Sequence, residues 1–451
     1  MKKPDGVFGW GLHLFAGGEM ENFSVVMRGA RFLRYGIGVC LVLVSSSPTA
    51  ALAKENILRG GVTLGQGYDS NIDRDYQDRE AEWTSSVSPS LSISSSDKRE
   101  EYFLRYAPEV VYSHRTDNER IDHSALGKFS KQWTERVRTF IQDSFRRAEE
   151  PYEDEEAFVR LSDKRGRNRY SVNSFISKAE YEYAQESILK LGYDNQVLDN
   201  SEAGREDFVK HSPGLAVTHR FDHRWSGVAD YLFTHGNFDE SDDLDRHGVN
   251  LYLYYNLTPS SKVFGRYGYS TLDYDGQQVD YDVQTATMGL ERALTPTMLL
   301  ALEGGGAFLS RDNGVDRDSF YFRFSLKEEL QRGALAVSAE SGIDEQQFSG
   351  VTDQGVSRYW KVKGNLLHNF SKHFQGTLTC SYRDDSFLER VTEEDEQEFR
   401  ADAALSYTFL QWYKASVKYT YVNKDADVVA NRYDDNRIFF FLSTEQDLLK
   451  W

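Results

Sequence analysis

The chain has 451 residues, a net charge of −18 and 14% aromatic residues, with 27 Tyr, 28 Phe and only 8 Pro. It contains no apolar run approaching the ~20 residues of a transmembrane helix, which excludes a helical membrane protein. Its two cysteines, Cys40 and Cys380, exclude a disulfide framework.

The first 53 residues have the order of a secretory signal. Arg28, Arg31 and Arg34 precede the apolar stretch 37–44, and 51–53 reads Ala-Leu-Ala, a small-residue cleavage pattern. We predict cleavage before Lys54 and favour Met27 as the start, with residues 1–26 as an upstream extension. Cleavage leaves 48 basic residues against 68 acidic ones and a net charge of −20.

The mature chain, 54–451, shows a recurrent alternation of apolar and polar residues. It is clearest at 319–327, SFYFRFSLK, where Phe and Leu occupy the even positions and polar or cationic residues the odd ones. Successive side chains of a strand point to opposite faces, so one face is apolar and the other polar. This pattern predicts a single all-β domain, a transmembrane antiparallel barrel with lipid outside and a wet interior.

We expect about 18–20 strands, since barrel strands need ~9–11 residues to cross a membrane. The residues favour twenty: 57–68, 82–94, 99–113, 121–132, 136–147, 169–183, 187–194, 207–220, 224–238, 247–257, 262–274, 281–294, 298–310, 319–330, 334–345, 358–369, 373–383, 398–409, 412–423 and 436–445.

Short and long connections alternate, which is a second and independent signal. Bacterial barrels place short turns in the periplasm and long loops outside, and an even strand number puts both termini in the periplasm. The short connections are 221–223, 258–261, 295–297, 331–333 and 370–372. The long, acidic ones are 69–81, 148–168, 195–206, 239–246, 275–280, 311–318, 346–357, 384–397 and 424–435.

Ten cations fall on the predicted inward face. Rings of Lys or Arg in a pore favour anions, so these residues are candidates for lining an anion-conducting lumen. The alternative is that they pair with inward acids such as Glu109 and Asp402 on neighbouring strands. The ten are Arg105, Arg138, Arg266, Arg323, Lys327, Lys361, Lys363, Arg400, Lys414 and Lys418.

No catalytic constellation stands out, and we expect no enzyme, no metal site and no cofactor. His219 and His223 have H-x-x-x-H spacing, but at a strand end this does not align two ligands as it does on a helix. A lipid-modifying barrel enzyme would need a serine beside a histidine on the outer face. The sequence does not single out such a pair.

The C-terminal segment ends on an aromatic residue, Trp451, which we expect the barrel-assembly machinery to read. Asp447 breaks the apolar alternation that Leu449 would continue. We therefore predict that the last strand ends near residue 445 and that 446–451 form a short tail.

The segment 60–72, GGVTLGQGYDSNI, resembles the opening of the β-barrel porin family associated with bacterial exopolysaccharide loci. Gly67, Tyr68, Asp69 and Asn71 match its Gly-Tyr-Asp-x-Asn motif, and 88–91, SPSL, is also similar to the family. The resemblance implies a Gram-negative outer-membrane conduit for exopolysaccharide or anionic solutes. It implies contact with lipid, lipopolysaccharide, the assembly machinery and a periplasmic export partner, and none with nucleic acid.

Two other classes remain open. The first is a structural or adhesive barrel whose loops bind a surface partner while side chains and loops close the lumen. The second is the lipid-modifying barrel enzyme.

Overall fold

The computed structural model describes residues 54–149, 169–201, 205–276, 278–312, 316–345, 348, 356–388 and 394–451. The signal predicted for residues 1–53 lies outside these ranges. The strands are β1 (Glu55–Asp69), β2 (Glu82–Ser96), β3 (Glu100–Ser113), β4 (Asn118–Gln132), β5 (Val137–Glu149), β6 (Arg169–Ala184), β7 (Ser187–Asn200), β8 (Phe208–Arg220), β9 (Trp225–Phe238), β10 (Leu244–Thr258), β11 (Ser261–Tyr274), β12 (Tyr281–Thr295), β13 (Met298–Arg311), β14 (Arg317–Leu330), β15 (Gly333–Glu345), β16 (Val356–Asn369), β17 (Phe374–Phe387), β18 (Glu394–Phe409), β19 (Tyr413–Ala426) and β20 (Tyr433–Lys450).

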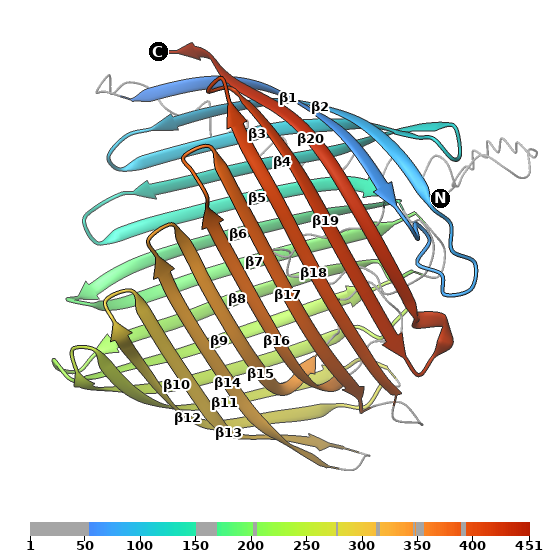
Figure 1. Ribbon diagram of the computed structural model, residues 1–451. Helices are drawn as coiled ribbons and strands as arrows, with labels where there is room; N and C mark the ends of the chain where they lie inside the picture. Colours follow the sequence, from blue (N-terminus) through green and yellow to red (C-terminus); the bar gives the residue numbers. More distant parts are fainter. Residues whose placement is uncertain are drawn as a thin grey trace, which may run out of the picture. The chain divides into compact units, whose positions relative to one another are not determined.

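Every strand pairs antiparallel with its neighbours in sequence, and β1 also pairs with β20. The first and last strands therefore lie side by side and close a twenty-stranded barrel (Figure 1). This confirms the predicted all-β fold. Closure leaves no unpaired strand edge, which is what a sheet needs in order to sit in a bilayer. Among the described residues, no helix is long and apolar enough to cross a membrane.

The predicted C-terminal tail is wrong, because β20 continues to Lys450. A register shift of β1 between Leu58 and Arg59 accommodates the break in alternation at Asp447. Arg59 Nε then donates to Asp447 Oδ1 at 2.7 Å. The polar residue that suggested a strand end is thus an ion-pair partner of the first strand. β7 also runs beyond its predicted end at 194, to Asn200.

The outward face of the barrel carries large, exposed apolar side chains. Met288 is 78% exposed and Phe320 is 67% exposed. Aromatic pairs lie at both strand ends: Tyr68 with Trp83 near the long loops, and Trp225 with Tyr255 near the short turns, at centroid distances of 4.9 and 4.7 Å. Such aromatic girdles mark the two interfaces of a membrane-spanning barrel.

Buried apolar residues gather on the inward face at the long-loop end. One cluster contains Tyr170, Leu198, Phe208 and Leu244, with Phe348 packed against it. A second cluster contains Leu272, Tyr281, Val283, Leu309 and Val356. These clusters pack the inner wall beneath the loops, and the polar interior extends from there toward the short turns.

Candidate functional site

The face that carries the predicted cations is the concave interior. Arg266 on β11 donates from Nη1 to the Tyr321 hydroxyl on β14 at 3.1 Å, although β12 and β13 lie between these strands. Three strand spacings measure ~14 Å along the sheet. Side chains converge over such a distance only on the inside of a curved sheet.

Glu303 on β13 is the centre of this interior network. It is 7% exposed and accepts a hydrogen bond of 2.6 Å from the Thr287 hydroxyl. Arg266 Nη1 lies 3.7 Å from its Oε1, and Arg323 Nη1 lies 3.9 Å from its Oε2. One buried carboxylate is thus shared by two guanidinium groups, which offset the cost of burying its charge.

A row of charged register partners extends from Glu303 across seven strands. Each member lies directly opposite the next, and the sign alternates except between Lys361 and Arg383. Because barrel strands are tilted and staggered, the row climbs from the middle of β13 to the long-loop end of β19. Its members are Glu303, Arg323, Glu340, Lys361, Arg383, Glu398 and Lys424.

Carboxylates of their own strands hold Arg383, a member of this row, and Arg400, and Asp344 on β15, two strands away, also holds Arg383. Arg383 donates to Asp385 at 2.5 Å and to Asp344 at 2.5 Å, and its guanidinium lies 4.6 Å from the ring centre of Tyr359. Arg400 donates to Asp402 at 2.7 Å. Both guanidinium groups are therefore largely neutralised and fixed in place.

The ten predicted cations separate into groups. Arg266, Arg323, Arg400 and Lys418 contact carboxylates, the last at 3.6 Å from Asp402. Lys361 and Lys363 sit opposite Glu340 and Ser338. Within the described ranges, no carboxylate contacts the remaining four, and all four are exposed to solvent: Arg105, Arg138, Lys327 and Lys414. Pairing with carboxylates thus accounts for only some of the ten predicted cations.

The four residues of the Gly-Tyr-Asp-x-Asn motif lie at the seam where β1 meets β20. Asn71 is fully buried, and its side-chain amide donates to the backbone oxygens of Asp75 and Asp434 at 2.9 and 3.0 Å. Asp69 accepts from the Asn71 backbone at 2.8 Å. The Tyr68 ring packs against the Trp83 ring at a tilt of 48°, and Gly67 lies beneath the Phe439 ring. The geometry gives the motif a structural role in fixing the first loop to the last strand.

Trp451 follows the end of β20. Its backbone exchanges two hydrogen bonds of 3.1 Å with Asn56, and its side chain is 59% exposed. The indole is therefore available to a partner while the backbone completes the seam.

The sequence interpretation missed a serine–histidine contact on the outward face. The Ser85 hydroxyl on β2 lies 2.8 Å from His114 Nε2, just after β3. The short turn between β2 and β3 pairs Ser85 with Tyr112, which places His114 diagonally across from Ser85. Extending the hairpin register from that turn would have brought the two residues together.

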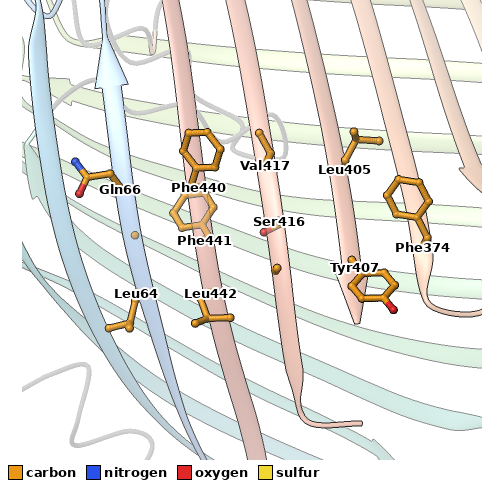
Figure 2. A pocket seen from close by; sticks show the side chains of 12 residues that line it. Leu64, Gln66, Phe374, Leu405, Tyr407, Ser416, Val417, Phe440, Phe441 and Leu442 are labelled. Atoms are coloured by element: carbon orange, nitrogen blue, oxygen red, sulfur yellow. The ribbon is translucent and has the colours of Figure 1, made fainter. Parts of the chain in front are cut away.

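A groove of about 580 Å³ lies on the outward face beside the seam between β1 and β20 (Figure 2). It crosses β1, β20, β19 and β18 and reaches the start of β17 at Phe374. Its walls are almost entirely apolar, and Gln66 is the polar residue at its β1 end. The lining includes Leu64, Gln66, Phe374, Leu405, Tyr407, Ala415, Val417, Phe440 and Leu442.

No protein-family model and no curated protein matches the chain. Solved outer-membrane receptors and porins resemble it in structure. A mutant of the ferric enterobactin receptor PfeA from Pseudomonas aeruginosa matches with a TM-score of 0.51 and 8% identity over 86% of this chain and 80% of that one. The siderophore receptor PirA from the same species gives 0.48 and 11%, over 89% and 81%. A BenF-like porin from Pseudomonas fluorescens gives 0.44 and 12%, over 87% and 99%. The match to PfeA shows the β-barrel fold.

Proposed function

We propose that the protein is a porin-like conduit of the Gram-negative outer membrane that passes anionic solutes. The observation that carries this proposal is a group of exposed cations on the concave face that no carboxylate of the described part of the chain contacts, Arg105, Arg138, Lys327 and Lys414. Barrels of about 16–18 strands leave a water-filled channel, and twenty strands enclose more. Solvent-exposed cations inside such a barrel favour anions over cations.

The degree of selectivity follows from how the interior charges are paired. The row from Glu303 to Lys424 contains four cations and three carboxylates, so it contributes little net charge. We attribute the anion preference to the exposed cations outside the row. Arg138, Lys327 and Lys414 lie near the short-turn ends of β5, β14 and β19. We therefore expect modest anion preference set at the periplasmic mouth.

The proposed location has separate support. Aromatic pairs at both strand ends and exposed apolar residues between them suit a bilayer. The predicted signal would export the chain, and lipopolysaccharide would face the long-loop end. The exposed indole of Trp451 is available to the assembly machinery.

Export of exopolysaccharide with a periplasmic partner is a narrower form of the same proposal. Its support is the motif carried by Gly67, Tyr68, Asp69 and Asn71, and the structural comparisons add none. A closed adhesive or structural barrel is the competing class.

Planar-bilayer conductance of refolded residues 54–451 distinguishes these classes. The conduit predicts stable single-channel steps and an anion-to-cation permeability ratio above one under a salt gradient. A correctly folded barrel that never conducts would contradict it and would favour the closed barrel. Anionic oligosaccharides added to one side should block the current if polysaccharide is the cargo.

A further inference from the structure

We propose that the outward face carries a second site, in which Ser85 and His114 hydrolyse acyl esters of bilayer phospholipids. This inference rests on the membrane location proposed above and is independent of whether the lumen conducts. Three observations carry it: the serine–histidine contact, its depth on the barrel wall, and the apolar groove that ends beside it.

The first observation is the geometry of the pair. Ser85 Oγ lies 2.8 Å from His114 Nε2, which is within reach for a general base to take the serine proton. The backbone N–H of His114 donates to the Trp83 carbonyl at 3.0 Å, so the histidine is tied to the serine's own strand. The Tyr112 ring packs edge-on against the imidazole at 4.8 Å, and its hydroxyl donates to Asp117 at 2.5 Å.

His114 differs from four other outward histidines, which contact tyrosines, and from His235, which contacts the Asp245 carboxylate at 2.7 Å. His123, His211, His219 and His247 each hydrogen-bond a tyrosine hydroxyl, at 2.7 to 3.0 Å. A tyrosine beside a histidine is a common way to satisfy a ring nitrogen near an interface. His114 instead faces an aliphatic hydroxyl, the group that becomes a nucleophile when a base removes its proton.

The second observation is the depth of the pair. Trp83 and Tyr68 form an aromatic pair on the same outward face, two residues nearer the long loops. Aromatic belts sit at the headgroup level. Two strand residues advance ~7 Å along a strand tilted by ~35–45°, so Ser85 lies ~5 Å below the belt. This is the depth at which the ester bonds of a phospholipid lie beneath its headgroup.

The third observation is the groove, which starts at Gln66. The Gln66 side chain lines the groove (Figure 2). It also accepts a hydrogen bond of 2.8 Å from the Ser85 hydroxyl. From there the outward side chains of Phe440, Val417 and Leu405 form one continuous row across β20, β19 and β18. From β1 to β17 the groove spans four strand spacings, ~19 Å.

An acyl chain of a bilayer phospholipid is the occupant that fits this groove. The wall is apolar, it faces hydrocarbon, and its length matches an extended fatty acid. The small side chain of Ala415 lies between Leu442 and Tyr407 and leaves room for a ligand in the groove. A chain lying there would place its carboxyl end at Gln66, beside Ser85.

The chemical step follows from these positions. The Ser85 hydroxyl turns its proton from Gln66 Oε1 to His114 Nε2, both 2.8 Å away. Ser85 Oγ then attacks the ester carbonyl carbon while His114 Nε2 takes that proton, and the Gln66 side-chain N–H group can donate to the resulting oxyanion. The tetrahedral intermediate expels the lysolipid alkoxide, which receives the proton from His114. Water, activated by His114 in the same way, then releases the fatty acid from the acyl-serine. The net reaction consumes one ester and one water and forms one acid and one alcohol.

The test uses the mature chain refolded in phospholipid vesicles, with two readouts. Fatty-acid release reports turnover, and covalent labelling by a fluorophosphonate, mapped by mass spectrometry, reports an activated serine. Ser85→Ala should abolish both, and His114→Ala should lower both by about 10²–10⁴-fold. Matched controls are Ser95→Ala, an outward serine of the same strand, and His123→Ala, an outward histidine bonded to a tyrosine.

Chain-length dependence tests the groove itself. Ala415→Trp should raise the KM for C16 esters by at least several-fold and leave C4 esters unchanged. Equal effects on both lengths would contradict the groove as the acyl site. Wild-type protein that folds and conducts, yet neither labels nor releases fatty acid, would overturn the hydrolase while leaving the conduit intact. Wild-type rates in Ser85→Ala would overturn the assignment of the nucleophile.

Discussion

Gly305 on β13 lies directly opposite Tyr321 on β14, between that tyrosine and Arg266, whose guanidinium donates to its hydroxyl. A Cβ at Gly305 would overlap the Ala286 carbonyl oxygen and lie 2.7 Å from Thr287 Cα. The missing side chain therefore lets β13 approach β12 closely. This close approach supports the bridge from Arg266 to Tyr321.

We predict that Gly305→Ala destabilises the barrel, since a backbone atom cannot move aside as a side chain can. Overpacking of this kind costs about 1–3 kcal/mol. Urea unfolding of the refolded protein would measure the change. The neighbouring Gly304→Ala is the control, because its Cβ would meet its nearest atom at 4.0 Å. Equal stability of the two variants would contradict the close approach.

Removing the exposed cations near the short turns should weaken anion preference. The triple variant Arg138→Gln, Lys327→Gln, Lys414→Gln is expected to lower the anion-to-cation permeability ratio. A unit charge felt at ~10 Å in water contributes about 0.4 kcal/mol, or about two-fold in permeability. The charge-conserving triple variant Arg138→Lys, Lys327→Arg, Lys414→Arg is the matched control, because it alters the same side chains and keeps the interior charge. An effect of this control as large as that of the neutral triple variant would contradict the role of these three charges.

Glu303 and Glu340 should contribute equally to the charge of the interior and unequally to stability. Glu303→Gln and Glu340→Gln each add one net positive charge, so each should raise anion permeability about two-fold and lower cation permeability about two-fold. Glu303 is buried against two guanidinium groups, whereas the Glu340 side chain is 33% exposed. Only Glu303→Gln should lower the urea midpoint clearly. A larger stability loss in Glu340→Gln would contradict the central role of Glu303.

Titration of Asp207, which lies between β7 and β8, should make the stability of the long-loop end depend on pH. Burial raises the pKa of this carboxyl from 3.8 to about 6. The folded state thus holds the proton more tightly than the unfolded chain, and this contribution to stability is complete below about pH 4 and lost as the pH rises through 6. The backbone amide of Asn200 donates to Asp207 Oδ1 at 2.6 Å, so its hydrogen exchange reports on this change in stability.

Hydrogen exchange of the Asn200 amide, corrected for its intrinsic rate, should be slower at pH 4.5 than at pH 7.5. Asp207→Asn keeps an oxygen acceptor and removes the titration, so the difference should vanish. Persistence of the same difference in the variant would assign the effect to another group.

The fold could be predicted from sequence because alternation is a local property. Phe320 and Phe322 identify the outward face of β14 without any knowledge of its partners, and the same parity places Arg323 inside. Register across neighbouring strands was needed to see that Arg323 lies between Glu303 and Glu340. The short turn between β14 and β15 fixes the register of Arg323 with Glu340, so that pairing was within reach of the sequence. The register of Arg323 with Glu303 depends on β13 and β14, which a long connection joins, and was not.

Other contacts depend on closure of the whole barrel. Asn71 reaches the backbone of Asp434, 363 positions away, only because β1 meets β20. The ion pair of Arg59 with Asp447 arises in the same way, and without it Asp447 looked like a strand end. Ser85 and His114 escaped notice because serines are frequent in β2, and their separation of 29 positions becomes meaningful once the hairpin register is applied.

Cysteine accessibility during conductance tests most directly the claim of a water-filled, cation-lined interior. In a Cys380→Ser background, Arg323→Cys places a thiol on the concave face and Phe322→Cys places one on the lipid face. A membrane-impermeant, negatively charged thiol reagent should modify Arg323→Cys and reduce its anion current, and leave Phe322→Cys unmodified. An Arg323→Cys thiol that does not react would contradict a water-filled interior. So would a Phe322→Cys thiol that reacts while the current of Arg323→Cys stays unchanged.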